Sequence, residues 1–278
     1  MRPAPVIRAA SRDETDAVVA LCRRLDNRDY AQQSWSEWVE AYPDLSLVAE
    51  LNGRVIGCVR ASVEFPGCAF AQALRVDATF RRMGVATALM QELLSRLSAA
   101  GIRRVLGVTG ADNVPARRFH PTLGLREVGA IARRRHPAWG RPALPVQPLE
   151  ESVAAALAGR EGLLVSRPGL AHFHRIYFRA SGEWLRARAR NGLLVAARDG
   201  GWALLDPPGA SGAWIAAFKQ STVQFAELAD VGVQLAGRQV VTFEAPADPL
   251  TQACLTGLGF EAPGPTDRYV VLEAAIPL

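Results

Sequence analysis

The sequence has few residues of the kinds that mark disulfide-stabilised, metal-bound or membrane-spanning proteins. It contains four cysteines, and no two of them form a C-x-x-C pair. This argues against a zinc site or a disulfide scaffold and favours buried reduced thiols. No stretch approaches the roughly 18 apolar residues of a membrane span, and the first residues contain no apolar signal segment. We therefore expect a cytoplasmic protein without metal ligands or a membrane partner.

Lysine is almost absent, since Lys219 is the only one, and arginine carries the positive side of a net charge of +5. Arginine presents a planar fork of donors that suits phosphate, so a polyanionic ligand is compatible with this composition. Nucleic acid would be another such partner, because the isoelectric point is about 9.4. However, the arginines are dispersed, and the densest run, Arg133–Arg135, is short and is read as a solvated strand end. We expect no nucleic-acid partner.

Periodicity predicts a mixed α/β (α+β) protein, and 278 residues suffice for two domains. Ser11 and Glu14 form a capping-box pattern before a helix. Asn52-Gly53 predicts a type I′ hairpin turn. Gly101 ends an amphipathic helix. The expected strands are Val6–Ala9, Leu45–Leu51, Arg54–Val63, Ala69–Val76, Val105–Thr109 and Arg126–Arg134, and the expected helices are Asp16–Leu25, Trp35–Ala41, Thr87–Ala99 and Val114–Leu123.

A proline-rich stretch, residues 137–148, predicts a linker between a domain at 1–136 and another at 149–278. The second half repeats patterns of the first. Leu47–Gly53 resembles Leu194–Gly200, and residues 103–125 align with residues 238–260 without a gap. The matching order of elements predicts a tandem repeat.

One segment combines the features of an anion site. Val76 ends a strand, Arg81-Arg82-Met83-Gly84 forms a turn, and an amphipathic helix follows. The first N–H groups of that helix have no intrahelical partners and lie at the positive end of its dipole. Gly84 would let the backbone approach a phosphate, so the segment predicts a pyrophosphate cradle. The alternative is a plain strand–turn–helix junction.

The pattern Arg81-x-x-Gly84-x-Ala86 resembles the acetyl-CoA signature of GNAT acetyltransferases. Downstream, Asn113, Ala116, Phe119-His120 and Leu123-Gly124-Leu125 resemble the closing pattern of the same family. The resemblance covers about residues 5–135. It implies two tandem GNAT-like domains, each with a mostly antiparallel central sheet flanked by helices and splayed around acetyl-CoA. The implied cofactor-binding residues are Leu74, Val76, Arg81, Arg82, Met83, Gly84, Val85, Ala86, Thr87, Asn113 and Arg117.

The catalytic residues are less well defined by this resemblance. Family members often carry a tyrosine acid where this chain has His120, which would donate a proton or simply pack against the sheet. The aligned strand lacks the usual glutamate, so Glu64 and Asp77, which flank it, are the candidate bases. We favour Glu64, because Asp77 also suits a turn. The resemblance implies a backbone oxyanion donor near Arg75 or Val76.

The second copy lacks this machinery. At the aligned positions Lys219 replaces the cradle glycine, Ser221 replaces Ala86, and Leu255 replaces His120. We expect a GNAT-like fold there without productive acetyl-CoA binding. His172-x-His174 has no matching third ligand, so packing is favoured over a metal site.

The sequence thus predicts an N-acetyltransferase that moves acetyl from acetyl-CoA to a primary amine of a small molecule or peptide. The alternative is a non-catalytic acyl-CoA-binding or regulatory module. Trp35, Trp38 and Tyr42 would line an acceptor pocket or belong to the core. The acceptor is not readable from the sequence, and a homodimer is compatible with it.

Overall fold

The computed structural model describes residues 4–65, 67–136, 147–148, 150–156, 170–173, 176–179, 182–192, 194–196, 202–204, 216–218, 241–247, 249–257 and 259–276. The chain forms two compact units. Unit 1 contains residues 1–107, 119–125 and 273–278, and unit 2 contains residues 108–118 and 126–272. Each unit is therefore built from segments that are distant in sequence.

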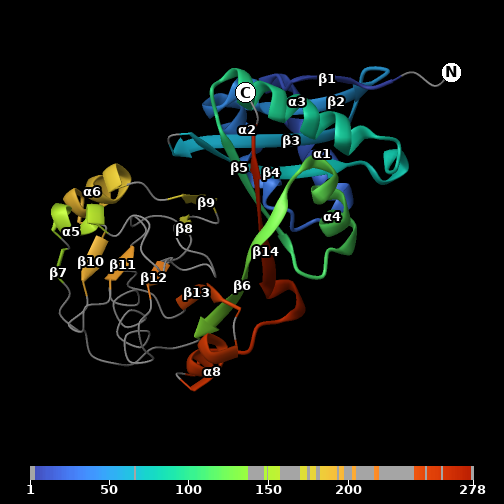
Figure 1. Ribbon diagram of the computed structural model, residues 1–278. Helices are drawn as coiled ribbons and strands as arrows, with labels where there is room; N and C mark the ends of the chain where they lie inside the picture. The colour runs from blue at the N-terminus through green and yellow to red at the C-terminus, as the bar shows by residue number, and fades with distance from the viewer. Residues whose placement is uncertain are drawn as a thin grey trace. The chain divides into compact units, whose positions relative to one another are not determined.

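Unit 1 is built on a central sheet in which β1, β2, β3, β4 and β5 are neighbours in chain order. The first four strands pair antiparallel, and β4 and β5 pair parallel. Figure 1 shows these strands in blue and green. Their bounds are Val6–Ala9, Ser46–Leu51, Arg54–Phe65, Cys68–Val76 and Arg104–Gly110, respectively.

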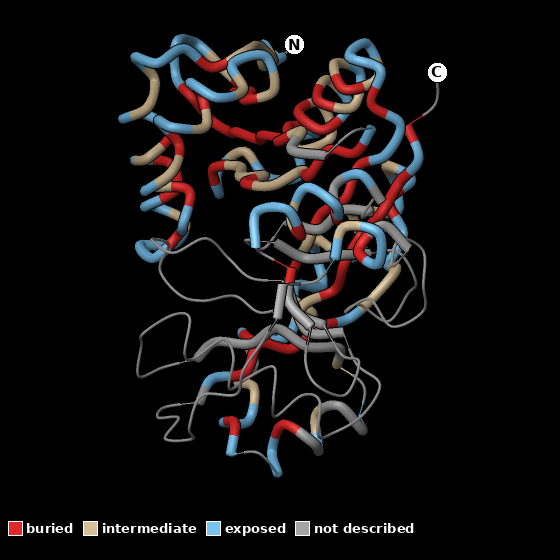
Figure 2. The backbone as a smooth tube through the Cα atoms, turned by 90° about the vertical axis from the view of Figure 1, so that its left-hand side faces the viewer, coloured by how far each residue is buried: buried red, intermediate tan, exposed pale blue. Residues whose placement is uncertain are grey.

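Helices α1 (Thr15–Leu25) and α2 (Ala31–Ala41) cover one face of this sheet, and α3 (Val85–Ala99) covers the other. Two neighbouring residues of β3 explain this, because successive residues of a strand point to opposite faces. Cys58 lies in the core cluster that α1 and α2 complete. A Cβ at Gly57 would lie 3.1 Å from Leu89 of α3. Figure 2 shows buried and exposed positions alternating around these helices.

The expected turn signals of unit 1 are confirmed. Asn52 and Gly53 have φ values of +52° and +74°, as a type I′ hairpin turn requires. The Glu14 carboxylate accepts a 2.8 Å hydrogen bond from the Ser11 N–H before α1. Gly101 has a φ of +76° and ends α3. These local elements therefore form where the sequence predicts them.

Unit 2 joins strands from both halves of the sequence. β6 (Arg126–His136) pairs antiparallel with β13 (Val241–Pro246), from His136 opposite Val241 to Ile131 opposite Pro246. β6 also neighbours β14 (Arg268–Ala275), whose last three residues belong to unit 1. The sequence places β6 with the first half of the chain, but its strand partners come from the second.

The rest of unit 2 contains two smaller sheets and four helices among the residues that the structure describes. A four-stranded sheet has the order β12-β11-β10-β7, and β8 pairs with β9. β7 lies in the stretch predicted as a linker, and its proline is tolerated because β7 is an edge strand. The bounds are α4 Val114–Phe119, β7 Gln147–Pro148, α5 Glu151–Ala156, β8 Leu170–Phe173, β9 Ile176–Arg179, α6 Gly182–Arg190, β10 Leu194–Ala196, β11 Trp202–Leu204, β12 Ala216–Phe218 and α8 Pro249–Gly257.

Candidate functional site

Strand β4 carries a bulge near its C-terminal end. Cys58 pairs with Arg75 and the register then shifts, so that Arg60 pairs with Gln72. One residue of β3 thus faces two of β4, Ala73 and Leu74, and Ala73 has a φ of +56°. A bulge with a residue in the left-handed region re-aims the backbone groups of its strand.

The pairing of β4 with β5 stops short of this bulge. Its last pair is Ala71 with Gly107, whereas β4 continues to Val76. Within the described ladders, the edge of β4 from Gln72 to Val76 has no strand on the β5 side. Backbone groups on such an edge can pair with an extended amide-containing ligand.

The predicted cradle follows β4 directly. After the 3₁₀ turn η3 (Ala78–Phe80), the turn Arg81–Gly84 leads into α3. Arg82 has a φ of +62° and Gly84 has a φ of +80°, so the turn uses the left-handed region twice. All four residues of the turn are exposed. The backbone therefore turns sharply in front of the helix N-terminus and leaves it accessible to a ligand.

Gly84 is the N-cap of α3, and its carbonyl accepts a 2.9 Å hydrogen bond from the Ala88 N–H. The first N–H groups of the 15-residue helix, beginning at Val85, precede that bond. They point along the helix axis at the positive end of its dipole. A Cβ at Gly84 would meet nothing within 4 Å, so this position requires glycine for its positive φ.

Asp77 holds the start of this turn. Its Oδ1 accepts hydrogen bonds from the N–H (3.1 Å) and hydroxyl (2.8 Å) of Thr79, and its Oδ2 accepts from Arg54 (2.6 Å) and Arg24 (3.2 Å). Burial opposes its ionisation, but the bonds from Thr79 and the charge of Arg54 outweigh burial and lower the pKa of Asp77. A carboxylate so committed is a poor base, which confirms the interpretation of Asp77 as a turn residue.

A second carboxylate, not singled out by the sequence, lies beside the bulge. Asp29, in the connection between α1 and α2, pairs with Arg75 through the Nε and one terminal nitrogen of the guanidinium. The Asp29 side chain is only 2% exposed. The two residues are 46 positions apart, and each is flanked by ordinary sequence, so no local pattern indicates the pair.

The family model for the acetyltransferase (GNAT) family matches residues 13–125 of the chain. An acetyltransferase of Pectobacterium atrosepticum is 30% identical over 115 residues, which make up 38% of this chain and 77% of that protein. The chain belongs to the GNAT family of acetyltransferases. Its class is therefore that of an acyltransferase.

Two further comparisons show how much of the chain resembles known proteins. The L-2,4-diaminobutyric acid acetyltransferase of Nocardia farcinica is 33% identical over 100 residues, or 35% of this chain and 48% of that protein. The chain thus spans about half the length of this curated relative. The crystal structure of a GCN5-related N-acetyltransferase from Sphaerobacter thermophilus has a TM-score of 0.64 and 16% identity. The aligned region covers 100% of this chain and 98% of the Sphaerobacter thermophilus chain, and the two chains share the fold.

The GNAT-matched segment contains the bulge, the cradle and both catalytic candidates. His120 begins the 3₁₀ turn η4 (His120–Leu123) in unit 1; its ring is half-buried, and its Nδ1 is shielded from solvent. Its ring centroid lies 5.7 Å from that of Phe119. Glu64 lies on β3, two residues beyond Ser62, and its side chain lies outside the described residues.

The two remaining cofactor candidates lie in unit 2. The side-chain oxygen of Asn113 accepts a 3.2 Å hydrogen bond from the Ala116 N–H at the start of α4. Arg117 donates to Glu127 at 2.6 and 3.0 Å and to the carbonyl of Ala111 at 2.9 Å. Both side chains thus have structural partners, and both residues are exposed.

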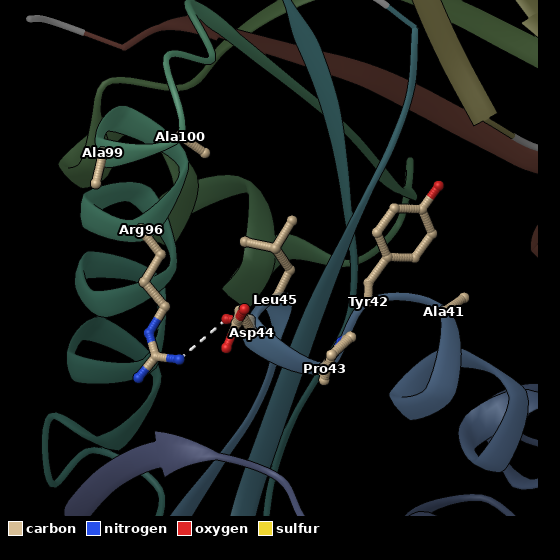
Figure 3. Close-up of a pocket in the computed structure, with 8 residues that line it drawn as sticks. All are labelled: Ala41, Tyr42, Pro43, Asp44, Leu45, Arg96, Ala99 and Ala100. Carbon is tan, nitrogen blue, oxygen red and sulfur yellow. Dashed lines mark hydrogen bonds between the residues drawn. The ribbon is translucent and has the colours of Figure 1, made fainter.

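A hollow at the C-terminal end of α3 contains none of the predicted cofactor-binding or catalytic residues (Figure 3). It has a volume of about 550 Å³, and Arg96 donates a 3.0 Å hydrogen bond to the carbonyl of Asp44 in its wall. A helix of 15 residues is about 22 Å long, so the hollow lies far from Gly84. Its lining residues are Ala41, Tyr42, Pro43, Asp44, Leu45, Arg96, Ala99 and Ala100.

The aromatic residues considered for an acceptor pocket divide between different environments. Trp35 is fully buried and belongs to the core of unit 1. Trp38 packs partly against that core, and its ring centroid lies 4.6 Å from the guanidinium carbon of Arg60. Tyr42 lines the hollow at the end of α3. Tyr30, which the sequence did not single out, is 39% exposed beside Arg75.

Part of the predicted second copy lies outside the described residues, including Lys219, Ser221 and His174. Leu255, aligned with His120, is fully buried in α8. Among the described residues, no group of His, Cys, Asp and Glu is placed to hold a metal ion, and no helix is long and apolar enough to cross a membrane.

Proposed function

We propose that this GNAT protein transfers acetyl from acetyl-CoA to a primary amine, and that unit 1 contains the donor site. The observation that carries the proposal is the cradle: an exposed turn with Gly84 at a φ of +80° leads into the N-terminus of α3. Phosphate groups are bound well by such backbone N–H groups. Arg81 and Arg82 add positive charge beside them, and Met83 to Thr87 complete the site.

The residues of the chain fit the elongated shape of acetyl-CoA. The edge of β4 beyond Ala71 offers backbone groups to its pantetheine amides, with Leu74 and Val76 as the proposed contacts. The nearby bulge at Ala73 supplies re-aimed N–H groups for the negative charge that develops on the carbonyl oxygen. Asn113 and Arg117, which belong to unit 2, stay predictions from the family pattern.

The donor supplies a thioester, whose acyl carbon is attacked by a neutral amine. An alkyl ammonium with a pKa of about 10.4 must lose a proton before it attacks. We propose that Glu64 receives this proton, since Asp77 is committed to Thr79 and two arginines. His120 is proposed to donate a proton to the departing thiolate. Its half-buried position at the start of η4 is compatible with this role.

The acceptor is proposed to be a small amine that also carries a carboxylate. The Nocardia farcinica relative is an L-2,4-diaminobutyric acid acetyltransferase, and this supports testing diamino acids first. Acetyl-CoA consumption should be measured with a panel of L-2,4-diaminobutyric acid, L-lysine, spermidine and an alanine-ended peptide. Saturable turnover with any of them supports acetyl transfer to an amine, and a preference for spermidine would contradict the proposed carboxylate. No turnover with any amine, together with acetyl-CoA binding, would instead support a non-catalytic acyl-CoA-binding module.

We further propose that residues 149–278 are a degenerate copy of the GNAT fold, without a working donor site. Gly259 has a φ of +88°, close to the +80° of its aligned residue Gly124. The N–H of Phe260 donates to the carbonyl of Leu255 at 3.0 Å, and the aligned bond in the first half, from Leu125 to His120, measures 3.2 Å. This shared local geometry supports the repeat. A cytoplasmic location and a homodimer also stay predictions.

A further inference from the structure

The two residues of the β4 bulge are held by side chains. The carbonyl of Ala73 accepts a 3.6 Å hydrogen bond from the Sγ of Cys58. The carbonyl of Leu74 accepts a 3.0 Å hydrogen bond from a terminal nitrogen of Arg75. The backbone groups of a bulge keep a fixed direction only if they form hydrogen bonds outside the regular ladder between the strands. Here two side chains provide those partners.

Two further nitrogens of Arg75 donate to a single carboxylate. Its Nε donates to Asp29 Oδ2, and its second terminal nitrogen donates to Asp29 Oδ1 at 3.0 Å. Burial works against the charge of Arg75, but its hydrogen bonds to Asp29 outweigh burial and raise its pKa. The guanidinium is therefore a permanently charged fork that holds the bulge on one side and Asp29 on the other.

Asp29 in turn anchors the connection between α1 and α2. Its Oδ1 also accepts a 3.0 Å hydrogen bond from the Ala31 N–H at the start of α2. The next residue, Tyr30, lies with its ring centroid 5.7 Å from the guanidinium carbon of Arg75 and is 39% exposed. The connection, the guanidinium and the bulge thus form one continuous bonded unit, although 46 residues separate Asp29 from Arg75.

We propose that Asp29 and Arg75 are positioning residues for acetyl transfer. They form a latch that fixes the peptide between Leu74 and Arg75, at the end of the bulge, and holds Tyr30 beside it. The role in turnover rests on the proposed function, whereas the latch itself is a property of the free protein. An ammonium is not equivalent to the guanidinium, because its three N–H groups diverge from one atom, whereas the guanidinium reaches Asp29 and the Leu74 carbonyl from three separate nitrogens in a plane.

The first test needs no ligand. Hydrogen–deuterium exchange of the full chain should be followed in peptides that span residues 72–77, for wild type, Asp29→Asn and Arg75→Lys. Asp29→Asn keeps the oxygen that caps Ala31 and removes the charge, so the fold should survive. We expect exchange at the bulge to accelerate at least about tenfold in both variants. The matched control is Arg8→Gln, which breaks a partly buried pairing with Glu14 and Glu50 elsewhere in unit 1 and should leave the bulge unchanged.

The second test measures turnover of acetyl-CoA with L-2,4-diaminobutyric acid. The two latch variants should lose about tenfold or more in kcat, while their KM for acetyl-CoA stays within about twofold, because misaligned reacting groups slow the chemical step. Arg8→Gln should match wild type in both constants. Unchanged exchange at residues 72–77, full rescue by lysine at position 75, or an unchanged kcat in folded Asp29→Asn would each overturn the proposal. If wild type turns over no amine of the panel, the proposed function fails, and the exchange result alone decides the latch.

Discussion

Two turns of the molecule have nearly the same backbone and different chemistry. In unit 1, η4 ends at Gly124 with a φ of +80°, and the Leu125 N–H returns to the carbonyl of His120 at 3.2 Å. In unit 2, α8 is followed by Gly259 with a φ of +88°, and the Phe260 N–H returns to Leu255 at 3.0 Å.

The side chains at the first position of each turn differ. His120 is half-buried with a titratable ring, whereas Leu255 is fully buried. The glycine and the buried residue after it, Leu125 or Phe260, set the turn in both places. The comparison teaches that the glycine and the buried residue after it specify the turn, so the side chain at the first position can differ between the two copies.

The largest effect on either turn is expected from truncating the buried side chain that follows its glycine. Leu125→Ala and Phe260→Ala should each lower the free energy of unfolding by about 3–4 kcal/mol, because both side chains are almost completely buried. Chemical denaturation of each variant measures the loss. A loss at Leu125 without one at Phe260 would contradict the equivalence of the two turns.

Placing a carboxylate in the cradle tests the proposed binding of acetyl-CoA there. Gly84→Glu should weaken acetyl-CoA binding at least about hundredfold, or about 3 kcal/mol, because it places a negative charge where phosphate binds. Gly53→Glu is the matched control, since Gly53 also has a positive φ and open space around it but lies in the β2–β3 turn. Calorimetric titration of both variants decides the matter, and equal affinities would remove the cradle from the account.

Replacing the titratable ring makes the first turn resemble the second. His120→Phe should reduce kcat about a hundredfold, the low end of what general acid catalysis contributes, and leave acetyl-CoA affinity nearly intact. Steady-state kinetics with the best amine measures this. Equal turnover would assign His120 to packing. The reverse change in the second half, Leu255→His, should not create activity.

The smallest expected effect concerns strain in the cradle. Arg82 has a φ of +62°, which an L-residue adopts at a cost of about 1 kcal/mol. Arg82→Gly should therefore raise the free energy of unfolding by up to about 1 kcal/mol while weakening acetyl-CoA binding severalfold. Thermal denaturation measures the change in stability, and titration measures the change in acetyl-CoA affinity. A destabilised variant would show that the arginine stabilises the turn.

Local features of the fold could be predicted from the sequence, because each depends on a few neighbouring residues. Asn52-Gly53 determines its hairpin, Gly101 ends α3, and Gly84 starts it. The pairing of β6 with β13, a strand from the second half of the chain, could not be predicted. Strand pairing depends on which distant segment lies beside the strand in the folded protein.

The candidate site divides in the same way. The cradle could be predicted because its residues are contiguous in the sequence. The turn role of Asp77 could be predicted because aspartate suits a turn. The bulge at Ala73 could not, because Gln72-Ala73-Leu74 contains no glycine to indicate a positive φ. The pairing of Asp29 with Arg75 depends on tertiary structure alone.

The central claim is that one half of the chain binds acetyl-CoA and the other does not. The most direct test is a calorimetric titration of the full chain with acetyl-CoA, accompanied by thermal denaturation. The account predicts one site per chain, and a stabilisation of about 2.7 kcal/mol at a ligand excess of about 100 dissociation constants. The absence of binding at millimolar acetyl-CoA, or the presence of two equivalent sites per chain, would contradict it.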